Sequence, residues 1–398
     1  MIRGVRQENC NAFLLALEGW RRGLRLTWHH ENDLEENKIL INKDFEIGNT
    51  FSLQNGEKEH FFHDSRGDQV EFNYIKYTKI DFLELLKDKG IETVEYTLLQ
   101  EQEIRGKLPN EILERGFPVN VTLEYNDNST KDFSVESKEA IEKIEATENV
   151  KRALVLHENK FEVYHVYIVD KKVVAAVKRF EVNGNEENLE TGYIDVKERL
   201  SGEVEHIVNS VVEELDIPHF GIEIHVFNNQ IKISNINLTD DIKKYIFPFD
   251  GTPRNVTQNI IDYYFPETLN KSLFRTQIYF DYKDVYKLLK NRVAGSLVID
   301  DAPDGELYAK RYVLHGDVQN REYLRWLRRQ VALKKLHGYM RSLSNGNVVV
   351  VIASHKKKRI DNFKNIFYSW SKSIQIDEIK EFDWKKQIKV GFEVRRKR

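Results

Sequence analysis

The sequence predicts a mixed α+β protein with several domains, and three observations support this fold class. The chain has 398 residues, enough for two or three hydrophobic cores. Apolar residues recur with helical spacing in some segments and alternate with polar residues in others, which indicates both helices and strands. With only 7 prolines and no Ser/Gly-rich tract, long disordered linkers between domains are not expected.

The first segment, residues 1–75, is predicted to begin with a helix and a strand. Apolar positions at helical spacing in NAFLLALEGWRRGL (11–24) indicate the helix, and LRLTWHH (24–30) follows as the strand. Further on, Asn55-Gly56 lies between two runs of polar and aromatic residues. This residue pair is typical of tight turns, so a turn is expected there.

The second segment, residues 76–270, mixes helices with strands. IDFLELLKDKG predicts a helix that Gly90 ends. Alternating apolar residues predict strands over 91–99, 117–125, 152–157, 161–169 and 172–180. The remaining pattern predicts a helix, a hairpin that turns at Asn228-Asn229, and another helix, over 203–217, 221–238 and 257–265.

The last two segments are a helical link, residues 271–305, and a compact domain, residues 306–398. The link ends in the turn-rich run DDAPDGE. Strand and helix patterns in the domain follow the order β-α-β-β-α-β. This order, with two helices on one face of a sheet, defines the ferredoxin-like split βαβ arrangement.

Charge and cysteine content exclude several classes of protein. Lys and Arg number 61 and Asp and Glu 64, a net charge of −3, so a nucleic-acid partner is not expected. Basic residues outnumber acids between Lys310 and Arg398, which is compatible with contact to RNA or an anionic lipid face and is interpreted as a solvated terminus. The single cysteine, Cys10, excludes an intrachain disulfide and a Cys-based zinc site. No apolar run approaches the roughly 18 residues of a membrane span, so a cytoplasmic protein is predicted.

The last segment resembles acylphosphatases along its whole length. The positions that carry the resemblance are Gly316, Val318, Gln319, Tyr323, Trp326, Gly338, Tyr339 and Gly346. In that family, loop N–H groups and an arginine hold a phosphate, and an asparagine positions the attacking water.

The residues at the acylphosphatase catalytic positions differ from the family pattern. The resemblance places Leu324 at the arginine position and Ser342 at the asparagine position, while Asn320-Arg321 replace the family's Gly-Val. Arg321 itself, or Arg325 with one extra loop residue, is the alternative phosphate ligand.

Residues 76–270 resemble the ATP-grasp fold of carboxylate–amine ligases. The motifs are VYIVDKKVVAAVKR (166–179) and the strand pair within LDIPHFGIEIHVFNNQIKISNINLTDDI (215–242). The resemblance implies an ATP-grasp fold followed by the ferredoxin-like acylphosphatase domain, with ATP and Mg²⁺ as cofactors. It assigns nucleotide-binding positions to Lys79, Thr122, Lys178 and Arg179, and metal positions to Glu223, Asn235 and Asn237.

Several of these positions lack the family's charges. Thr122 stands where the family has a phosphate-binding lysine, and the following loop EYNDNSTKD contains no glycine. Asn235 stands where a metal-binding glutamate is expected. A lost charge-assisted hydrogen bond is worth roughly 1.5–3 kcal/mol, so binding of ATP and Mg²⁺ is predicted to be weakened or lost.

Three hypotheses follow for the function. The first is a pseudoenzyme that serves as a scaffold or regulatory partner of an active paralogue or another cytosolic enzyme. The second is an active ATP- and Mg-dependent carboxylate–amine ligase that forms an acyl phosphate. The third is an acylphosphatase that hydrolyses acyl phosphates with Arg325 or Arg321 in the phosphate loop.

Overall fold

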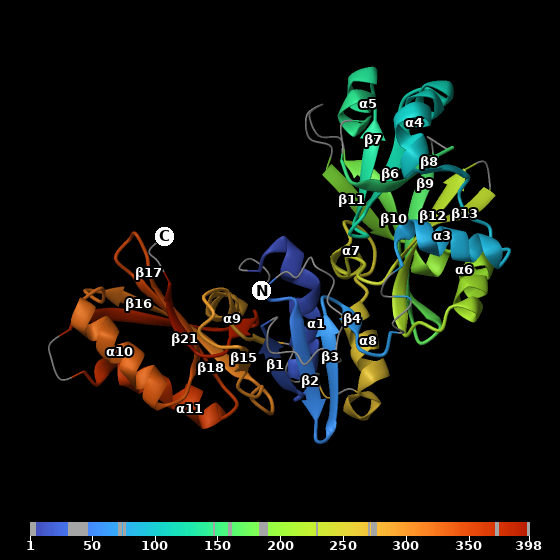
Figure 1. Ribbon diagram of the computed structural model, residues 1–398. Helices are drawn as coiled ribbons and strands as arrows, with labels where there is room; N and C mark the ends of the chain where they lie inside the picture. Colours follow the sequence, from blue (N-terminus) through green and yellow to red (C-terminus); the bar gives the residue numbers. More distant parts are fainter. Residues whose placement is uncertain are drawn as a thin grey trace. The chain divides into compact units, whose positions relative to one another are not determined.

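The protein is described by a computed structural model that covers residues 5–30, 47–70, 74, 77–145, 148–157, 161–182, 190–227, 230–269, 271, 277–370 and 374–395. The chain forms two compact units (Figure 1). The central unit contains the described residues from Phe61 to Tyr264, and the terminal unit contains those up to His60 and from Phe265 onward. Both units mix helices and strands, which confirms the predicted α+β class. Among the described residues, none of the helices combines the length and apolar character needed to cross a bilayer.

The first part of the terminal unit is a helix packed on a small sheet. The sheet has the strand order β15-β1-β2-β3. The Asn55-Gly56 turn joins β2 to β3, with Gly56 at φ +62°, as predicted. The elements are α1 (Cys10–Arg21), β1 (Arg25–His29), β2 (Thr50–Asn55), β3 (Lys58–His63), β14 (Ile278–Tyr279), α9 (Tyr282–Lys290) and β15 (Ser296–Val298).

Helix α1 is buried on all sides because neighbouring aromatic residues cover it. Phe13 packs edge-on against Phe280, with ring centroids 5.4 Å apart. Trp20 packs edge-on against the same Phe280 ring, with centroids 5.5 Å apart. Gly19 lets the helix approach β2 closely, since a Cβ at this position would lie 2.4 Å from a methyl carbon of Leu53. The charged residues of α1 are satisfied inside the core, because Glu18 pairs with Arg22 at 2.9 Å and Arg21 donates to the backbone oxygen of Ile278 at 2.9 Å.

The second part of the terminal unit is the ferredoxin-like domain. Its sheet has the order β19-β16-β18-β17-β21, in which β17 and β21 run parallel and the other neighbours antiparallel. This β-α-β-β-α-β arrangement confirms the predicted one. Its elements are β16 (Tyr308–Gly316), α10 (Arg321–Leu333), β17 (His337–Ser342), β18 (Val348–Ser354), α11 (Lys357–Asp361), β19 (Ile376–Asp383), β20 (Ile388–Lys389) and β21 (Phe392–Arg395).

Both helices of this domain cover one face of the sheet. Tyr323, Leu327 and Val331 of α10 share a core with Val350 and other residues on that face of the strands. The 3-10 helix η6 (Asn362–Tyr368), which continues α11, adds its own apolar side chains to the same core. The opposite face of the sheet is packed by Trp384 and its neighbours.

The central unit contains two sheets. The smaller has the order β5-β8-β6-β7 and the larger β11-β10-β9-β12-β13. The strands of these two sheets are β5 (Tyr96–Gln100), β6 (Val119–Tyr125), β7 (Thr130–Val135), β8 (Val150–Leu156), β9 (Glu162–Val169), β10 (Lys172–Val182), β11 (Glu190–Asp195), β12 (His219–Phe227) and β13 (Gln230–Asn237). The short strand β4 (Arg66–Gly67) pairs instead with the end of β3. The helices of the central unit are α3 (Lys79–Asp88), α4 (Glu101–Arg115), α5 (Lys138–Glu145), α6 (Gly202–Glu214), α7 (Lys243–Ile246) and α8 (Val256–Tyr264).

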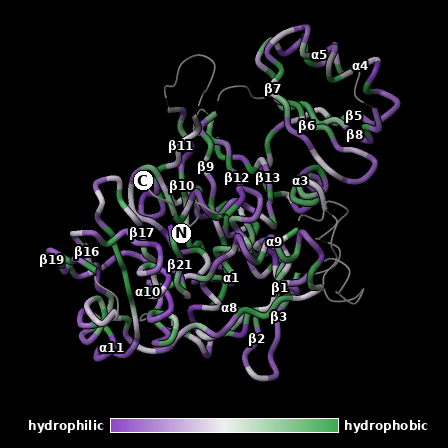
Figure 2. The backbone as a smooth tube through the Cα atoms, turned by 90° about the vertical axis from the view of Figure 1, so that its left-hand side faces the viewer, coloured by the Kyte–Doolittle hydropathy of each residue, from purple (hydrophilic) through white to green (hydrophobic). Residues whose placement is uncertain are grey.

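Helix α3 connects the cores of the two sheets. Ile80 and Leu83 pack against Leu154 of the smaller sheet, whereas Phe82 and Leu86 pack with the larger sheet and α6. Hydropathy colouring shows green, apolar stretches along β9 and β12, which form this larger core (Figure 2). The predicted turn of the β12–β13 hairpin, Asn228-Asn229, lies outside the described residues.

Candidate functional site

The first candidate site lies in the central unit, on the face of the smaller sheet that α3 approaches. Strand alternation sends Val121 and Leu123 of β6 into the core under α4 and α5. Thr122 and Glu124 therefore point to the opposite face. Both are buried, with Glu124 entirely inaccessible. This is the face where the ATP-grasp resemblance implies a triphosphate.

A network of ion pairs centred on Arg152 fills this face. The Arg152 guanidinium donates to Glu124 at 2.9 and 2.5 Å, to Asp81 at 2.6 Å and to Glu84 at 2.9 Å. Glu124 also accepts from the Lys151 ammonium at 2.8 Å and from the Thr78 hydroxyl at 3.1 Å. Burial would raise the pKa of Asp81, but hydrogen bonds from the Thr78 backbone N–H, at 2.8 Å, and from Arg152 hold it below its usual value. Each charge in the network is therefore already matched inside the protein.

Lys79 and Thr122, two predicted nucleotide-binding residues, meet at one carboxylate. The Thr122 hydroxyl donates to Asp132 of the neighbouring strand β7, and the Lys79 ammonium lies 3.3 Å from the same carboxylate. The structure thus brings these two positions together, as the resemblance implies. Asp132 occupies the place beside them that an anionic ligand would need.

Glu223, a predicted metal ligand, is held by its neighbours on β12 and β13. Its carboxylate accepts from the Ser234 hydroxyl at 2.7 Å and from His225 Nε2 at 3.3 Å. Burial alone would raise the pKa of Glu223, but the His225 hydrogen bond and nearby positive charge, Lys79 included, hold it well below its usual value. Glu223 is therefore ionised and satisfied without a metal.

The other two predicted metal ligands do not complete a magnesium shell. Asn235 lies opposite Glu223 in the β12–β13 pairing. The Asn237 side-chain oxygen accepts from the backbone N–H of Thr239 at 3.0 Å, closing a turn. Across the residues that the structure describes, no group of three His, Cys, Asp or Glu side chains is arranged to hold a metal ion. Mg²⁺ beside a nucleotide is held by one or two carboxylates together with phosphate oxygens and water, and Glu223 is the one carboxylate among the three predicted ligands.

Lys178 and Arg179, the last predicted nucleotide-binding pair, point to opposite faces of β10. Lys178 pairs with Glu162 at 2.6 Å and lies over the Tyr164 ring, on the face that packs toward α6. The opposite face carries His165, whose pKa burial lowers to about 4, assisted by the positive charges of Lys244 and Arg179. Arg179 therefore faces the side of Glu223, and Lys178 does not.

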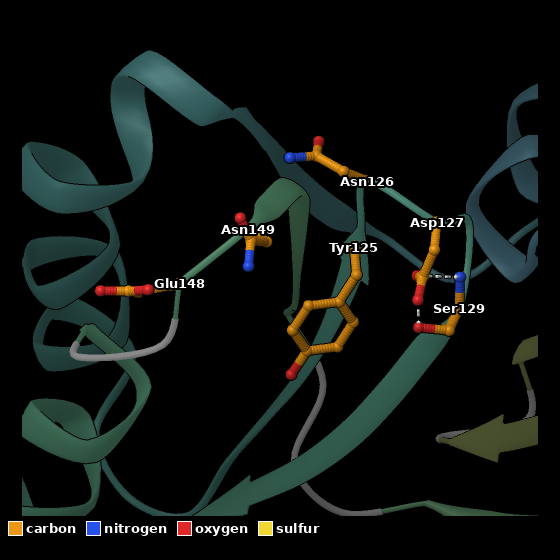
Figure 3. Close-up of a pocket in the computed structure, with 6 residues that line it drawn as sticks. All are labelled: Tyr125, Asn126, Asp127, Ser129, Glu148 and Asn149. Atoms are coloured by element: carbon orange, nitrogen blue, oxygen red, sulfur yellow. Dashed lines mark hydrogen bonds between the residues drawn. The ribbon is translucent and has the colours of Figure 1, made fainter.

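A polar pocket of about 490 Å³ lies beside the turn between β6 and β7, where the resemblance implies a phosphate loop. Figure 3 shows its lining, with Asp127 accepting from both the N–H and the hydroxyl of Ser129 at 3.0 and 2.7 Å. The lining side chains include no basic residue and two acids, Asp127 and Glu148. Such a pocket repels phosphate rather than binding it.

The second candidate site is the loop between β16 and α10 in the terminal unit. Gly316 has φ +120°, and a Cβ there would lie 2.3 Å from the backbone oxygen of Gln375. The loop therefore keeps the glycine that its backbone path requires. The Asn320 side chain caps α10 by accepting from the N–H groups of Glu322 and Tyr323 at 2.9 and 3.2 Å. Helix N–H groups available to a bound anion are thereby used internally.

The predicted acylphosphatase residues lie apart from a phosphate cradle. Leu324 packs half-buried against the core of the domain, and Ser342 ends β17. Arg321 and Arg325 are exposed on α10. Gln319 donates to the backbone oxygens of Leu343 and Asn347 at 2.7 and 3.2 Å and so fixes the loop to the β17–β18 connection.

Sequence reasoning missed the Arg152 network. Arg152 and Glu124 lie 28 residues apart and meet only because β6 and β8 are adjacent and antiparallel. The alternation of residues in β6 and β8 nevertheless contained a signal for this network. Both are charged residues inside strands whose other positions are largely apolar, and such residues inside a sheet require partners.

Comparison with known proteins places ATP-grasp ligases among the similar solved structures. One is the ATP-grasp ligase PsnB complexed with a phosphomimetic variant of its minimal precursor, Mg and ADP. Its identity is 14% and its TM-score 0.39, over 49% of this chain and 60% of that one. A bifunctional glutathione synthetase from Pasteurella multocida is 12% identical over 60% of this chain and 42% of that one, with a TM-score of 0.39. D-alanine–D-alanine ligase from Bacillus anthracis complexed with ATP is 15% identical over 49% and 67%, with a TM-score of 0.35.

The chain spans about 60% of the length of the PsnB chain. A search of curated proteins gives no match. Residues 310–394 match the family model described as acylphosphatase, which confirms the resemblance predicted for the last segment.

Proposed function

We propose that this chain is a non-catalytic protein that uses ATP-grasp-like and acylphosphatase-like architecture as a scaffold or regulatory partner of another protein. The observation that carries the proposal is the Arg152 network. The best-placed cation on the nucleotide-facing side of the smaller sheet already serves three carboxylates of its own chain.

The energetics of the network oppose a bound triphosphate. Phosphate could recruit Arg152 only by separating it from Glu124, a carboxylate that is fully buried. Breaking a buried ion pair costs roughly 3–5 kcal/mol because one charge is left unmatched. A charge-assisted hydrogen bond to phosphate returns about 1.5–3 kcal/mol, so the exchange is unfavourable.

The phosphate loop supports the same proposal independently. An anion at the start of α10 would have to displace the Asn320 cap, and it would find Leu324 where a cation is needed. Arg321 and Arg325 stay on the exposed helix surface. Neither the ligase alternative nor the acylphosphatase alternative gains a specific supporting contact.

Calorimetry with millimolar ATP and Mg²⁺ tests the proposal directly. We expect no saturable heat for the full chain, no ADP release with a panel of amino acids, and no hydrolysis of benzoyl phosphate above the spontaneous rate. Turnover in the ADP assay would establish the ligase alternative. Benzoyl phosphate hydrolysis that Arg325→Ala abolishes would establish the acylphosphatase alternative, and either result ends the proposal.

Binding without turnover requires a matched pair of variants. Lys79→Met removes a cation that lies beside Thr122 and Asp132 in the first candidate site. Lys172→Met removes a cation that pairs with Asp170 on an exposed turn. Weak ATP binding that only Lys79→Met abolishes would locate a bound nucleotide at the first candidate site. The proposed function would then become that of a scaffold that binds nucleotide.

A further inference from the structure

The charge of this chain is divided sharply between two regions. Residues 61–264 contain 24 Lys and Arg against 39 Asp and Glu, a net of −15. Residues 310–398 contain 23 against 8, a net of +15. The near-neutral total therefore conceals a strongly basic ferredoxin-like domain.

The basic residues gather on the helical layer of that domain. Between Arg321 and Asp361 eleven Lys and Arg face only two acids. Since α10 and α11 cover the same face of the sheet, their outward sides form one surface. It carries exposed basic residues from both helices and the turn after α10, which include Lys334, Lys335, Lys356, Lys357 and Lys358.

Helix α10 contributes the densest part of this basic surface. Arg321, Arg325, Arg328 and Arg329 are separated by four, three and one residues, so they share one side of the helix. All four are exposed. Within the part of the chain that the structure describes, none of the four makes an ion pair with a carboxylate. Four unmatched guanidinium groups along a helix of 13 residues form a stripe suited to successive phosphates.

Aromatic side chains lie within the same helical layer. Trp326 follows Arg325 on α10 and is half-buried, and its ring lies 6.5 Å from that of Trp370, which follows η6. Tyr368, beside Trp370, is 58% exposed. Trp326 and Trp370 pack partly against the domain core and keep part of their surface accessible. Basic side chains beside accessible aromatic rings are the combination by which proteins hold single-stranded nucleic acids, because phosphates bind the cations and bases stack on the rings.

We infer that the helical layer of the ferredoxin-like domain binds single-stranded nucleic acid, with the four α10 arginines on phosphates and Trp326 and Trp370 beside the bases. The inference is independent of whether either candidate site is catalytic. It differs from the expectation of a solvated basic surface, since only the fold brings α10 and α11 onto one face.

The geometry favours nucleic acid over an anionic membrane. Helices that lie on membranes insert their apolar side into the lipid. The apolar sides of α10 and α11 are instead occupied, because Leu327, Val331 and Ile360 form the domain core. The surface is rich in arginine, whose planar guanidinium binds phosphate through two hydrogen bonds.

Fluorescence anisotropy with a labelled 20-nucleotide oligouridine tests the inference on the full chain. Arg325→Gln/Arg328→Gln removes two charges from the stripe. Its matched control, Lys385→Gln/Lys386→Gln, removes two exposed charges next to Trp384, which packs on the opposite face of the sheet. We expect the first variant to bind roughly tenfold more weakly at 100 mM salt and to lower the salt slope by about 1.4. The control should bind as the parent chain does.

Three further measurements define what would overturn the inference. An abasic oligomer of the same length should bind at least about fivefold more weakly, since stacking is lost. Equal binding of the abasic oligomer, or equal weakening in the lysine control, would overturn it. Binding to vesicles of anionic lipid without binding to oligouridine, or self-association in low salt without such binding, would assign the surface to a membrane or to a second copy of the acidic central unit.

Discussion

The Arg152 network of the smaller sheet and the β16–α10 loop both satisfy their polar groups inside the protein, but in different ways. The network contains charged residues that pair with one another, as Arg152 does with Glu124, Asp81 and Glu84. The loop retains its backbone path, including Gly316 at φ +120°, and supplies a neutral side-chain cap from Asn320. In the network, charged side chains satisfy one another, whereas in the loop a neutral side chain satisfies backbone N–H groups. The ion pairs of the network should contribute far more to the free energy of unfolding than the cap does.

The largest expected effect is a loss of stability when the Arg152 network is broken. Arg152→Met should lower the free energy of unfolding by about 3 kcal/mol, because buried Glu124 then keeps only Lys151 as its ionic partner. Urea denaturation monitored by circular dichroism measures this loss. The control Arg105→Met changes an exposed arginine of α4 and should alter stability by less than about 0.5 kcal/mol. Equal losses of stability in Arg152→Met and Arg105→Met would mean that the Arg152 network does not stabilise the central unit.

The second effect is a pH dependence to which two buried histidines of the central unit contribute. Burial lowers the pKa of His219 to about 3 and that of His165 to about 4. Below the unfolded value of about 6.5, the unfolded chain binds protons that these folded imidazoles do not bind. Stability is therefore complete above pH 6.5 and decreases as the pH falls toward 4.

A histidine substitution isolates this dependence. His219→Gln should reduce the pH slope of the unfolding free energy by about 1.4 kcal/mol per pH unit between pH 6 and 4. Urea titrations at several pH values measure the slope. His206→Gln, which changes an exposed histidine of α6, should leave it unaltered. A slope that is the same in the parent and both variants would show that His219 is protonated in the folded state.

The third effect addresses the loop. Asn320→Ala removes the α10 cap and should cost about 1 kcal/mol, several times less than loss of Arg152. Asn320→Asp keeps a capping oxygen and serves as the control, with stability close to that of the parent chain. Thermal denaturation of the three proteins provides the measurement. A loss in Asn320→Ala as large as that in Arg152→Met would remove the contrast between the two regions.

The smallest effect concerns Lys178, on the face of β10 that points away from Glu223. Its exposed pair with Glu162 contributes little, so Lys178→Met should change stability by less than about 1 kcal/mol. Nucleotide titration should give the same result for Lys178→Met as for the parent chain. A nucleotide affinity that depends on Lys178 would place a bound nucleotide on the face of the larger sheet opposite Glu223 and would contradict the proposed absence of binding.

Local sequence patterns predicted much of the fold because residues close together in the sequence determine many helices and turns. Helix α10, the helix ended by Gly90 and the Asn55-Gly56 turn all follow from residues close together in sequence. Helix α4 was not predicted, since Pro109 and its many charges weaken the helical pattern. Its burial of Ile104, Leu108 and Ile112 against β6 and β8 stabilises the helix, and that contact is tertiary.

The candidate sites were predictable only in part for the same reason. The ATP-grasp resemblance assigned Lys79, Thr122 and Glu223 to one site, and the fold brings these three residues to one region. Spacing alone did not separate Lys178 from Arg179, because their opposite orientations depend on the register of β10 against β9. Nor did it show that Asp132 and Arg152 pair with groups far away in sequence.

The short parallel pair formed by β14 and β20 has a consequence for how this chain can be divided. The backbone N–H groups of Ile388 and Val390 donate to Gln277 and Tyr279 at 2.7 and 2.8 Å, and Lys389 pairs with Asp281 at 2.6 Å. A protease cut between Asp304 and Gly305, which are both exposed, would separate the acylphosphatase-like domain covalently from the residues before it. The two pieces would still be joined by this ladder, so the cleaved protein should migrate as one particle until denaturant releases the fragments.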